Sequence, residues 1–379
     1  MRTAVVSDLH LGHGAGADLL RRPAFVARLL EALDGVDRLV LLGDVVEMRD
    51  IPLTESIAVA RPLFARLADA LPGGEIVIVG GNHDHHLVER WLEDRALGDP
   101  APLELEHRFE PTDGAIGELA AAAAGCRVWA AYPGLWLRDD VYATHGHFLD
   151  RHLTVPTFER MGIGVVERLL GIPPDGPDPL DPPEDPEQAT IEDYERVQAP
   201  VYGFLTALAE SGGSRRAGAN PSARVWEMVG GGESRSARLR GWLLGSVAVP
   251  GAVGVANRLG IGPVRADLSP GAVTRAGVQA MSEVVERLRI DAAHVVFGHT
   301  HRRGPIGAEP GWESGDTRLW NTGSWVHSPP LLRSTAAESP YWPGTIGFLD
   351  DDGEPELRHL LDDLDREDLG AGELDRTPR

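Results

Sequence analysis

The sequence contains no lysine, a single cysteine and few aromatic side chains, which make up 6% of the residues. One cysteine, Cys126, cannot form an internal disulfide, so a small scaffold stapled by disulfides is excluded. Arginine supplies all 36 basic side chains against 58 acidic ones, which gives a formal net charge of -22. Because an acidic chain repels polyanions, general nucleic-acid binding is disfavoured.

The sequence also lacks an apolar run long enough to span a membrane. Trp242–Asn257 is uncharged, but a spanning helix needs about 20 apolar residues, and Pro250 interrupts this run. We expect a hairpin that is buried or packs within a cap, with a segment that dips into lipid as the alternative. Only Met1 to Ser7 precede Asp8, the first candidate site residue, and they do not contain the roughly 7–15 apolar residues of a cleavable signal. The expected location is the cytoplasm.

Short apolar runs alternate with amphipathic stretches in the first part of the chain and again near its end, a pattern typical of a layered α/β fold. The expected helices are Pro23–Leu33, Glu55–Leu71 and His86–Ala96. The expected strands are Thr3–Val6, Arg38–Leu42, Ile76–Val79, Val128–Ala131, Leu135–Leu137, Val141–Thr144, His294–Phe297, Arg318–Trp320, Thr345–Leu349 and Glu356–Leu360.

The middle of the chain has a different composition. Ile172–Glu187 carries seven prolines and reads as an extended linker, while Thr190–Leu208 and Ala272–Leu288 have helical periodicity. The tail is acidic and poor in apolar residues. We therefore expect a sheet domain formed by residues 1–147 and 291–361, an inserted and mostly helical cap formed by residues 148–290, and a disordered tail formed by residues 362–379.

Five short polar sequences each follow an apolar, strand-like run. Because ligands gather at the carboxyl ends of strands in open α/β sheets, all five could converge on one edge. Side chains two residues apart on a strand point the same way, so the polar pairs of the first and last sequences each share a face. The five are Asp8-Leu-His10, Gly43-Asp44, Gly81-Asn82-His83-Asp84, His145-Gly-His147 and Gly298-His299-Thr-His301.

These sequences offer carboxylate, imidazole and amide groups but no thiolate, a set that suits Mn, Fe or Zn better than a soft metal. Seven candidate ligands exceed the needs of one catalytic ion and indicate two ions that share a carboxylate. Two metals about 3.5–4 Å apart can hold both oxygens of a phosphoryl displacement, and a hydroxide between them would be the nucleophile. The candidates are Asp8, His10, Asp44, Asn82, His145, His299 and His301.

In this order, and each after a strand, the five sequences resemble the motifs of the calcineurin-like metallophosphoesterase superfamily. The resemblance covers roughly residues 1–147 and 291–350 and implies a layered αββα sandwich. The motif order is also similar to that of the UDP-2,3-diacylglucosamine hydrolases. Those enzymes usually carry Arg at the position of His83 and an acidic residue at that of His147, so the sub-family stays open.

The resemblance implies a role for each candidate. His83 would protonate the leaving oxygen, and Asp84 would orient His83. Asp44 would bridge two divalent or mixed-valence metal ions, Mn, Fe or Zn. Asp8, His10 and His301 would hold the first metal, and Asn82, His145 and His299 the second.

Some of these residues have alternatives. His147 could replace His145 as a ligand, and Glu47 is either an acceptor behind the site or a charge at a helix start. Asn321-Thr-Gly-Ser324 resembles a loop beside the family's site, but a plain strand exit explains it as well. We expect the remaining histidines to make ordinary hydrogen bonds: His13, His85, His86, His107, His152, His294, His327 and His359.

The predicted function is hydrolysis of a phosphate monoester, diester or pyrophosphate. The alternatives are a non-catalytic scaffold, disfavoured by the filled ligand positions, and a nuclease of the same superfamily, disfavoured by the acidic charge. We expect a phosphorylated small-molecule or lipid-like substrate, and the cap could bring the protein to a membrane surface. A cluster of arginines could hold a second phosphate or anionic lipid heads: Arg215, Arg216, Arg224, Arg235, Arg238 and Arg240.

Overall fold

The computed structural model describes residues 1–98, 101–172, 188–212, 249–265, 267, 270–332 and 335–370. The chain divides into two compact units. The sequence predicts a sheet domain of residues 1–147 and 291–361, and this assignment of domains remains a prediction. Unit 1 comprises Met1–Gly146, Thr206–Arg216 and Asp291–Arg379, and unit 2 comprises His147–Leu205 and Ala217–Ile290.

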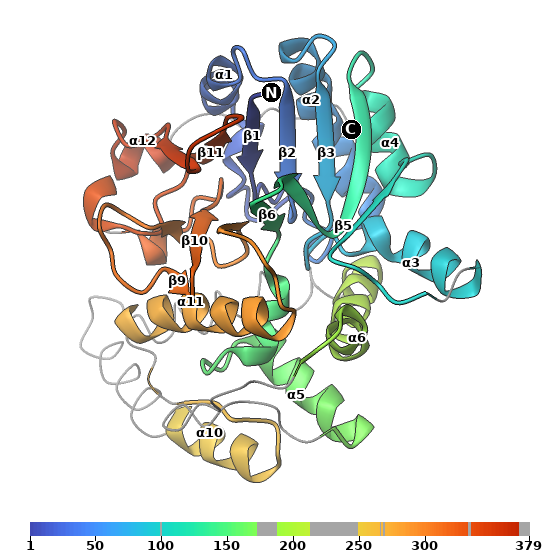
Figure 1. The fold of residues 1–379 in the computed structure, drawn as a ribbon, viewed down its shortest axis with the longest axis vertical. Coiled ribbons are helices and arrows are strands. Elements are labelled where there is room, and N and C mark those ends of the chain that lie inside the picture. Colours follow the sequence, from blue (N-terminus) through green and yellow to red (C-terminus); the bar gives the residue numbers. More distant parts are fainter. Residues whose placement is uncertain are drawn as a thin grey trace. The chain divides into compact units, whose positions relative to one another are not determined.

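Twelve strands of unit 1 form one connected sheet, in the order β12-β11-β1-β2-β3-β5-β6-β7-β10-β8, with β4 paired to β5 and β9 to β10 (Figure 1). The pairs β1–β2, β2–β3, β3–β5, β6–β7 and β7–β10 are parallel. The strands are β1 (Thr3–Val6), β2 (Arg38–Leu42), β3 (Glu75–Val79), β4 (Glu106–Phe109), β5 (Arg127–Arg138), β6 (Val141–Thr144), β7 (His294–Phe297), β8 (Arg303–Gly304), β9 (Glu313–Ser314), β10 (Thr317–Thr322), β11 (Thr345–Leu349) and β12 (Glu356–His359).

The central strands are buried on both faces, because their side chains alternate between two apolar clusters. In β2, Leu39 and Leu41 belong to one cluster, and Val40 and Leu42 belong to the other. The second cluster also contains Val296 of β7, so it fills the space between the two halves of the sheet. The first cluster joins the strands to helices. The prediction of a layered α/β sandwich is confirmed.

Strand β5 is longer than the sequence predicts. Its first part pairs with β3 through Arg127–Ala131, and its second part pairs with β6 from Gly134 onward. The sequence splits it into two short strands at Pro133, since proline has no N–H to give to a ladder. In the structure this position faces a bulge opposite Glu106 of β4, where the ladder is already irregular. One strand can therefore pass from one half of the sandwich to the other.

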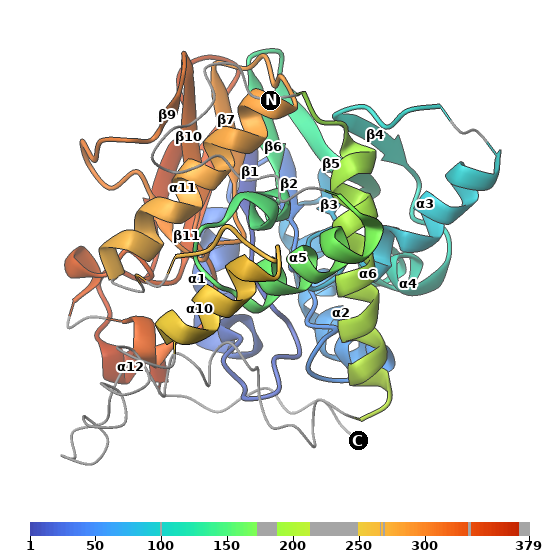
Figure 2. The ribbon, with the colours of Figure 1, turned by 90° about the horizontal axis from the view of Figure 1, so that it is seen from below.

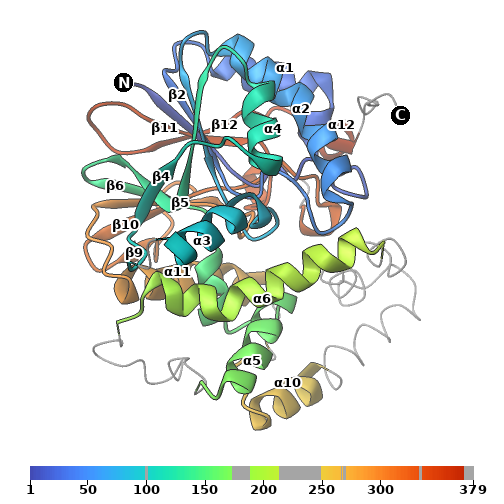
Figure 3. The same cartoon turned by 90° about the vertical axis from the view of Figure 1, so that its right-hand side faces the viewer.

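Helices α1, α2 and α4 cover one face of the sheet, as Figure 3 shows. Pro23 opens α1 at its first helical position, as the sequence indicates. Helix α4 is absent from the predictions because an alanine run flanked by glycines has no clear amphipathic face. The helices and 3₁₀ turns of unit 1 are η1 (Leu19–Arg21), α1 (Pro23–Ala32), α2 (Leu53–Ala70), α3 (His86–Gly98), α4 (Gly114–Ala122), η4 (Pro329–Leu331), η5 (Ala336–Glu338) and α12 (Arg366–Gly370).

Residues 362–370 differ from the predicted disordered tail. Leu369 of α12 is fully buried, and its carbonyl accepts a hydrogen bond of 2.6 Å from Arg22. The Arg28 guanidinium donates two hydrogen bonds of 2.7 Å to the carboxylate of Asp363. The acidic composition that suggested disorder is thus compensated by Arg22, just before α1, and by Arg28 within it. Residues 371–379 lie outside the described residues.

The described part of unit 2 is helical. Its elements are η2 (His147–His152), α5 (Phe158–Leu170), α6 (Ile191–Glu210), whose last residues belong to unit 1, α10 (Val249–Arg258) and α11 (Pro270–Arg287). Figure 2 shows α10 beside α5. The expected hairpin over Trp242–Asn257 is wrong for its described part, since Val249–Asn257 is helical, with Val253 and Ala256 packed as apolar core.

The linker from Pro173 to Glu187 and the predicted arginine cluster lie outside the described residues. In the ranges that the structure describes, no helix is both long and apolar enough to cross a membrane.

Candidate metal centre

Every candidate ligand lies just beyond the carboxyl end of a strand. The parallel pairing places neighbouring strand ends on the same edge, so side chains from distant parts of the sequence can meet there. Asp8 and His10 follow β1, Asp44 follows β2, Asn82 follows β3, His145 follows β6, and His299 and His301 follow β7.

Most of these residues have a left-handed backbone, with φ between 45° and 65°. A residue with a side chain pays about 1–2 kcal/mol for this conformation. In the described ranges, Arg289 is the one other non-glycine residue with a positive φ. Backbone strain gathered at polar residues of one edge is typical of a functional site. The strained candidates are Asp8, His10, Asp44, His299 and His301.

Two glycines of the motifs are required because candidate ligands lie against them. A Cβ atom at Gly81 would collide with the carboxylate and the backbone nitrogen of Asp44. A Cβ atom at Gly298 would collide with the carboxylate of Asp8 and the hydroxyl of Ser7. The motif glycines therefore let the chain approach the polar side chains closely.

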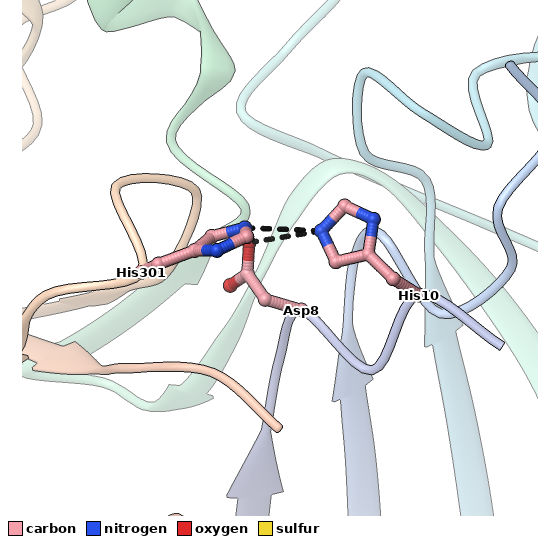
Figure 4. A group of neighbouring side chains, drawn as sticks. All are labelled: Asp8, His10 and His301. Atoms are coloured by element: carbon pink, nitrogen blue, oxygen red, sulfur yellow. Dashed lines mark hydrogen bonds and ion pairs between the residues drawn. The ribbon is translucent and has the colours of Figure 1, made fainter. Parts of the chain in front are cut away.

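Asp8, His10 and His301 form the first group, with their polar atoms turned toward one another (Figure 4). Nε2 of His301 lies 3.0 Å from Nε2 of His10 and 3.3 Å from Oδ1 of Asp8. Oδ1 of Asp8 is buried and has no hydrogen-bond partner among the described residues. A buried lone pair without a donor is costly, and a cation among these three atoms would remove that cost.

Asp44, His145 and His299 form the second group. Nε2 of His145 lies 3.4 Å from Oδ1 of Asp44. Nδ1 of His145 lies 2.9 Å from the backbone carbonyl of Leu42, to which it donates its proton. In the neutral imidazole, this bond fixes the tautomer and leaves the Nε2 lone pair directed at the site, the usual arrangement behind a metal-binding histidine.

The Asp44 carboxylate faces both groups. Its Oδ2 lies 3.5 Å from Nε2 of His10, and its Oδ1 accepts a hydrogen bond of 2.7 Å from the backbone N–H of His83. Burial alone would raise the pKa of Asp44, but the charges of His145, His83 and His10 hold that pKa well below its usual value. An ionised carboxylate therefore stands between the two sets of imidazoles.

The Asn82 amide also belongs to the second group. Its Oδ1 lies 3.0 Å from Nδ1 of His299 and 3.1 Å from Nε2 of His145, so three acceptor atoms face one another. The reversed amide would instead donate to both imidazoles and give its oxygen to Arg49 at 3.2 Å. The reversed amide suits a site held together by hydrogen bonds alone, whereas an amide oxygen that points into the site suits a bound cation. The oxygen of Asn82 and the ring nitrogens of His145 and His299 therefore fit a second ion as its ligands.

Glu47 holds two of the histidines from behind. Its carboxylate lies 3.0 Å from Nδ1 of His10 and 2.8 Å from Nδ1 of His83, and it accepts the backbone N–H of Arg49 at 2.9 Å. Burial raises the pKa of Glu47, but the charge of His83 and the hydrogen bonds from both imidazoles lower it well below its usual value. The contacts of Glu47 are those of an acceptor behind the site, and not those of a charge at a helix start.

Asp84 does not have the contacts that its predicted role requires. Its carboxylate accepts backbone N–H groups from Gly81 and Val45, each at 2.7 Å, and from Asp44 and Val46 at longer range. It ties the loop after β2 to the loop after β3, and Glu47 instead lies against His83. The signal for Glu47 was its position three residues after Asp44, which places it beside the same strand end.

The metal-free site favours protons on two candidate ligands. Burial alone would lower the pKa of His10, but its hydrogen bond to Glu47 and the charge of Asp44 raise it to about 9. Burial likewise opposes the effect of Asp44 on His145, whose pKa is raised to about 10. Positive charge is thus stabilised where the cations would bind, and bound cations would replace these protons.

His145 is expected as the metal ligand, with His147 as the alternative, and the structure places His145 in the second group. The His147 ring packs edge-to-face with Phe148 and Tyr202, and its backbone carbonyl accepts a hydrogen bond of 3.1 Å from Gln198, all within unit 2. In the described ranges, His147 is not part of a cluster of potential metal ligands.

Asn321 braces the last motif. Its Nδ2 donates to the carbonyl of Gly298 at 2.8 Å and to the hydroxyl of Thr300 at 3.0 Å, and its Oδ1 accepts the N–H of Gly323. The backbone N–H of Trp325 donates to the carbonyl of Asp8 at 3.0 Å. The Asn321–Ser324 loop therefore lies beside the site, as the resemblance implies.

Residues 1–181 match the family model of the calcineurin-like phosphoesterases. The resemblance to that family is confirmed. The match covers the motifs after β1, β2, β3 and β6, and it continues beyond the predicted end of the sheet domain at residue 147. Together with the His and Asp clusters, this match supports a metal-dependent phosphoesterase.

No curated protein matches the chain. Among solved structures, the chain is similar to a dimetal phosphatase from Danio rerio, with 13% sequence identity and a TM-score of 0.35. That match covers 94% of this chain and 98% of the other.

Proposed function

We propose that the chain hydrolyses a phosphate ester or a pyrophosphate with two divalent metal ions, Mn, Fe or Zn, bound at this edge of the sheet. The observation that carries the proposal is the position of Asp44, 3.5 Å from the imidazole of His10 and 3.4 Å from that of His145. A carboxylate that faces two sets of ligands is suited to being shared between two ions. When bound, such a pair supplies charge stabilisation and a nucleophile near neutral pH.

The proposed ligand sets follow the two groups of side chains. The family match supports them, and so does the fit of each donor set to a cation. Asp8, His10 and His301 would hold one ion, Asn82, His145 and His299 would hold the other, and Asp44 would contact both.

His83 is the proposed general acid. Its Nδ1 is held by Glu47 at 2.8 Å, so Nε2 is the nitrogen left to meet a substrate, and its side chain is 15% exposed, more open than Glu47 at 2%. A general acid must reach the leaving oxygen, and this exposure gives His83 such access. Glu47 keeps the ring in place, the role first predicted for Asp84.

The proposed substrate is a small phosphorylated or lipid-like molecule, and the net charge of -22 argues against nucleic acid. The test is hydrolysis of a panel of monoesters, diesters and nucleotide pyrophosphates by metal-free protein to which Mn, Fe or Zn is added. We expect turnover with at least one metal and loss of it in the Asp44→Asn variant. Tight binding of two ions without turnover on any class would instead support the scaffold.

A further inference from the structure

Large exposed apolar side chains gather on the helices of unit 2. Of the nine such residues in the described ranges, two, Met1 and Leu97, lie elsewhere. Soluble proteins expose scattered apolar residues, but a concentration of them on one set of helices marks an interaction surface. The other seven are Phe158, Val165, Leu169 and Leu170 of α5, Phe204 of α6, and Val255 and Leu259 in and just after α10.

Helices α5 and α10 pack against each other, with Met161 of α5 against Val253 and Ala256 of α10, and Figures 2 and 3 agree in placing them side by side. Gly164 allows this approach, since a Cβ atom there would collide with the backbone of Ile261. The two helices therefore form one layer of unit 2.

Both helices present the same exposed pattern, an apolar residue, then arginine three positions later and leucine four positions later. In α5 the residues are Val165, Arg168 and Leu169, and at the end of α10 they are Val255, Arg258 and Leu259. Residues three and four apart share a helix face. We name these six residues the α5–α10 patch. Leu169 is 80% exposed and Leu259 56% exposed, so both leucine side chains lie largely open to solvent among the residues that the structure describes.

The charge of the patch is opposite in sign to that of the chain. Arg168 and Arg258 are exposed, whereas the neighbouring Glu167 is buried and bound by Arg151 at 2.9 Å. Glu159, at the opposite end of α5, is half-buried. The six patch residues combine leucine with arginine and include no acid, which makes them complementary to anionic lipid headgroups over acyl chains.

We propose that the α5–α10 patch binds the surface of an anionic lipid bilayer. Leu169 and Leu259 enter the boundary between headgroups and acyl chains, while Arg168 and Arg258 reach the lipid phosphates, since arginine can lay its stem along apolar surface and keep its head polar. A second copy of the chain fits less well, because a self-paired patch would bring its own arginines together. At about 0.1–0.15 M salt, the repulsion by the net charge of -22 acts weakly at the patch, because it is screened beyond about 8–10 Å.

The experiment measures partition of the full-length protein onto vesicles by flotation. The vesicles are phosphatidylcholine alone or mixed with phosphatidylglycerol, at low and high salt. We expect binding to mixed vesicles at about 0.1 M salt, the lower of the two salt concentrations. The double variant L169Q/L259Q should lower the partition coefficient about tenfold or more. Its matched control is L97Q, which changes a leucine that is 88% exposed on α3 of unit 1, and which should bind as the native protein does.

A second double variant, R168Q/R258Q, should lower binding to mixed vesicles about tenfold or more and leave binding to phosphatidylcholine unchanged. Near-native circular dichroism shows that each variant is folded. The proposal is overturned if the native protein stays with the aqueous phase, or if L169Q/L259Q and L97Q bind alike. A concentration-dependent dimer that L169Q/L259Q dissolves, without vesicle binding, would assign the patch to a second copy.

Discussion

Replacing Glu47 by glutamine tests how the site is organised, because this carboxylate holds both a candidate ligand and the candidate acid. The side chain of Glu47 is 2% exposed and accepts hydrogen bonds from Nδ1 of His10 and Nδ1 of His83. Glutamine has almost the same shape, but its amide offers one acceptor oxygen and one donor group. One imidazole must therefore lose its acceptor or change its tautomer. If His10 changes, its Nε2 carries a proton where a metal should bind.

The expected size follows from these contacts. A hydrogen bond to a buried charged group contributes about 1.5–3 kcal/mol. Losing one such bond lowers an equilibrium constant by roughly 10–100-fold. Removal of the partner behind a ligand histidine lowers metal affinity by about the same factor. We expect Glu47→Gln to weaken metal binding by roughly 10–100-fold if His10 is the imidazole affected. If His83 is affected, turnover should fall by a similar factor while metal binding is retained.

Two measurements separate these outcomes: metal affinity by titration of the metal-free protein, and turnover at saturating metal. The matched control is Glu31→Gln, which changes an exposed carboxylate on α1 and should alter neither quantity. Thermal unfolding followed by circular dichroism checks that the variant folds. Native affinity together with native turnover in Glu47→Gln would refute the role given to this residue.

The other predictions concern the shared carboxylate, the acid, a glycine and protons. Asp44→Asn should lose both ions, measured by mass spectrometry, and two retained ions with native turnover would contradict the shared ligand. His83→Ala should keep its metal and lose about 10²–10⁴-fold in turnover, less with a nitrophenolate leaving group; loss of metal would make His83 a ligand. Gly81→Ala should cost metal affinity, because its Cβ would displace Asp44. The raised pKa values of His10 and His145 stabilise the metal-free protein below about pH 6.5, and this contribution is lost as pH rises through about 9 and 10. Metal affinity should rise over that interval, and unchanged affinity in calorimetry would contradict proton displacement.

The strands of unit 1 could be predicted from sequence because both of their faces are apolar. Runs such as Arg38–Leu42 are short and apolar and are followed by glycine, which is typical of a buried strand. Strand β4 could not be found this way, since Glu106–Phe109 contains a single apolar residue and depends on β5 for its structure. Helix α12 was not predicted for a related reason, because its order depends on arginines that are far away in the sequence. Both β4 and α12 therefore depend on tertiary contacts, which cannot be read from local composition.

The candidate ligands could be predicted because chemistry limits which residues bind metal, and position after a strand limits where they meet. The partners behind them were harder to assign, because any nearby carboxylate can occupy that place. Asp84 adjoins His83 in sequence and was the natural choice, yet its carboxylate faces backbone N–H groups. Sequence proximity on a turn says little about side-chain direction, since one peptide unit can reverse it. Glu47 reaches His83 from another strand end, 36 positions away.

The left-handed backbone of five candidate ligands links the fold to the proposed chemistry. At about 1–2 kcal/mol each, this strain cannot be maintained by local preference and must be held by surrounding contacts. Asp84, Asn321 and the motif glycines supply those contacts through backbone groups. Asp84 and Asn321 do not touch the atoms that would bind metal, and the glycines leave room for those atoms, so that the ligand atoms are directed toward common points. Asp84→Asn should therefore lower metal affinity and thermal stability together, whereas a residue acting on His83 alone would lower turnover only. A variant with native stability and metal content but reduced turnover would return Asp84 to the role that the sequence suggested.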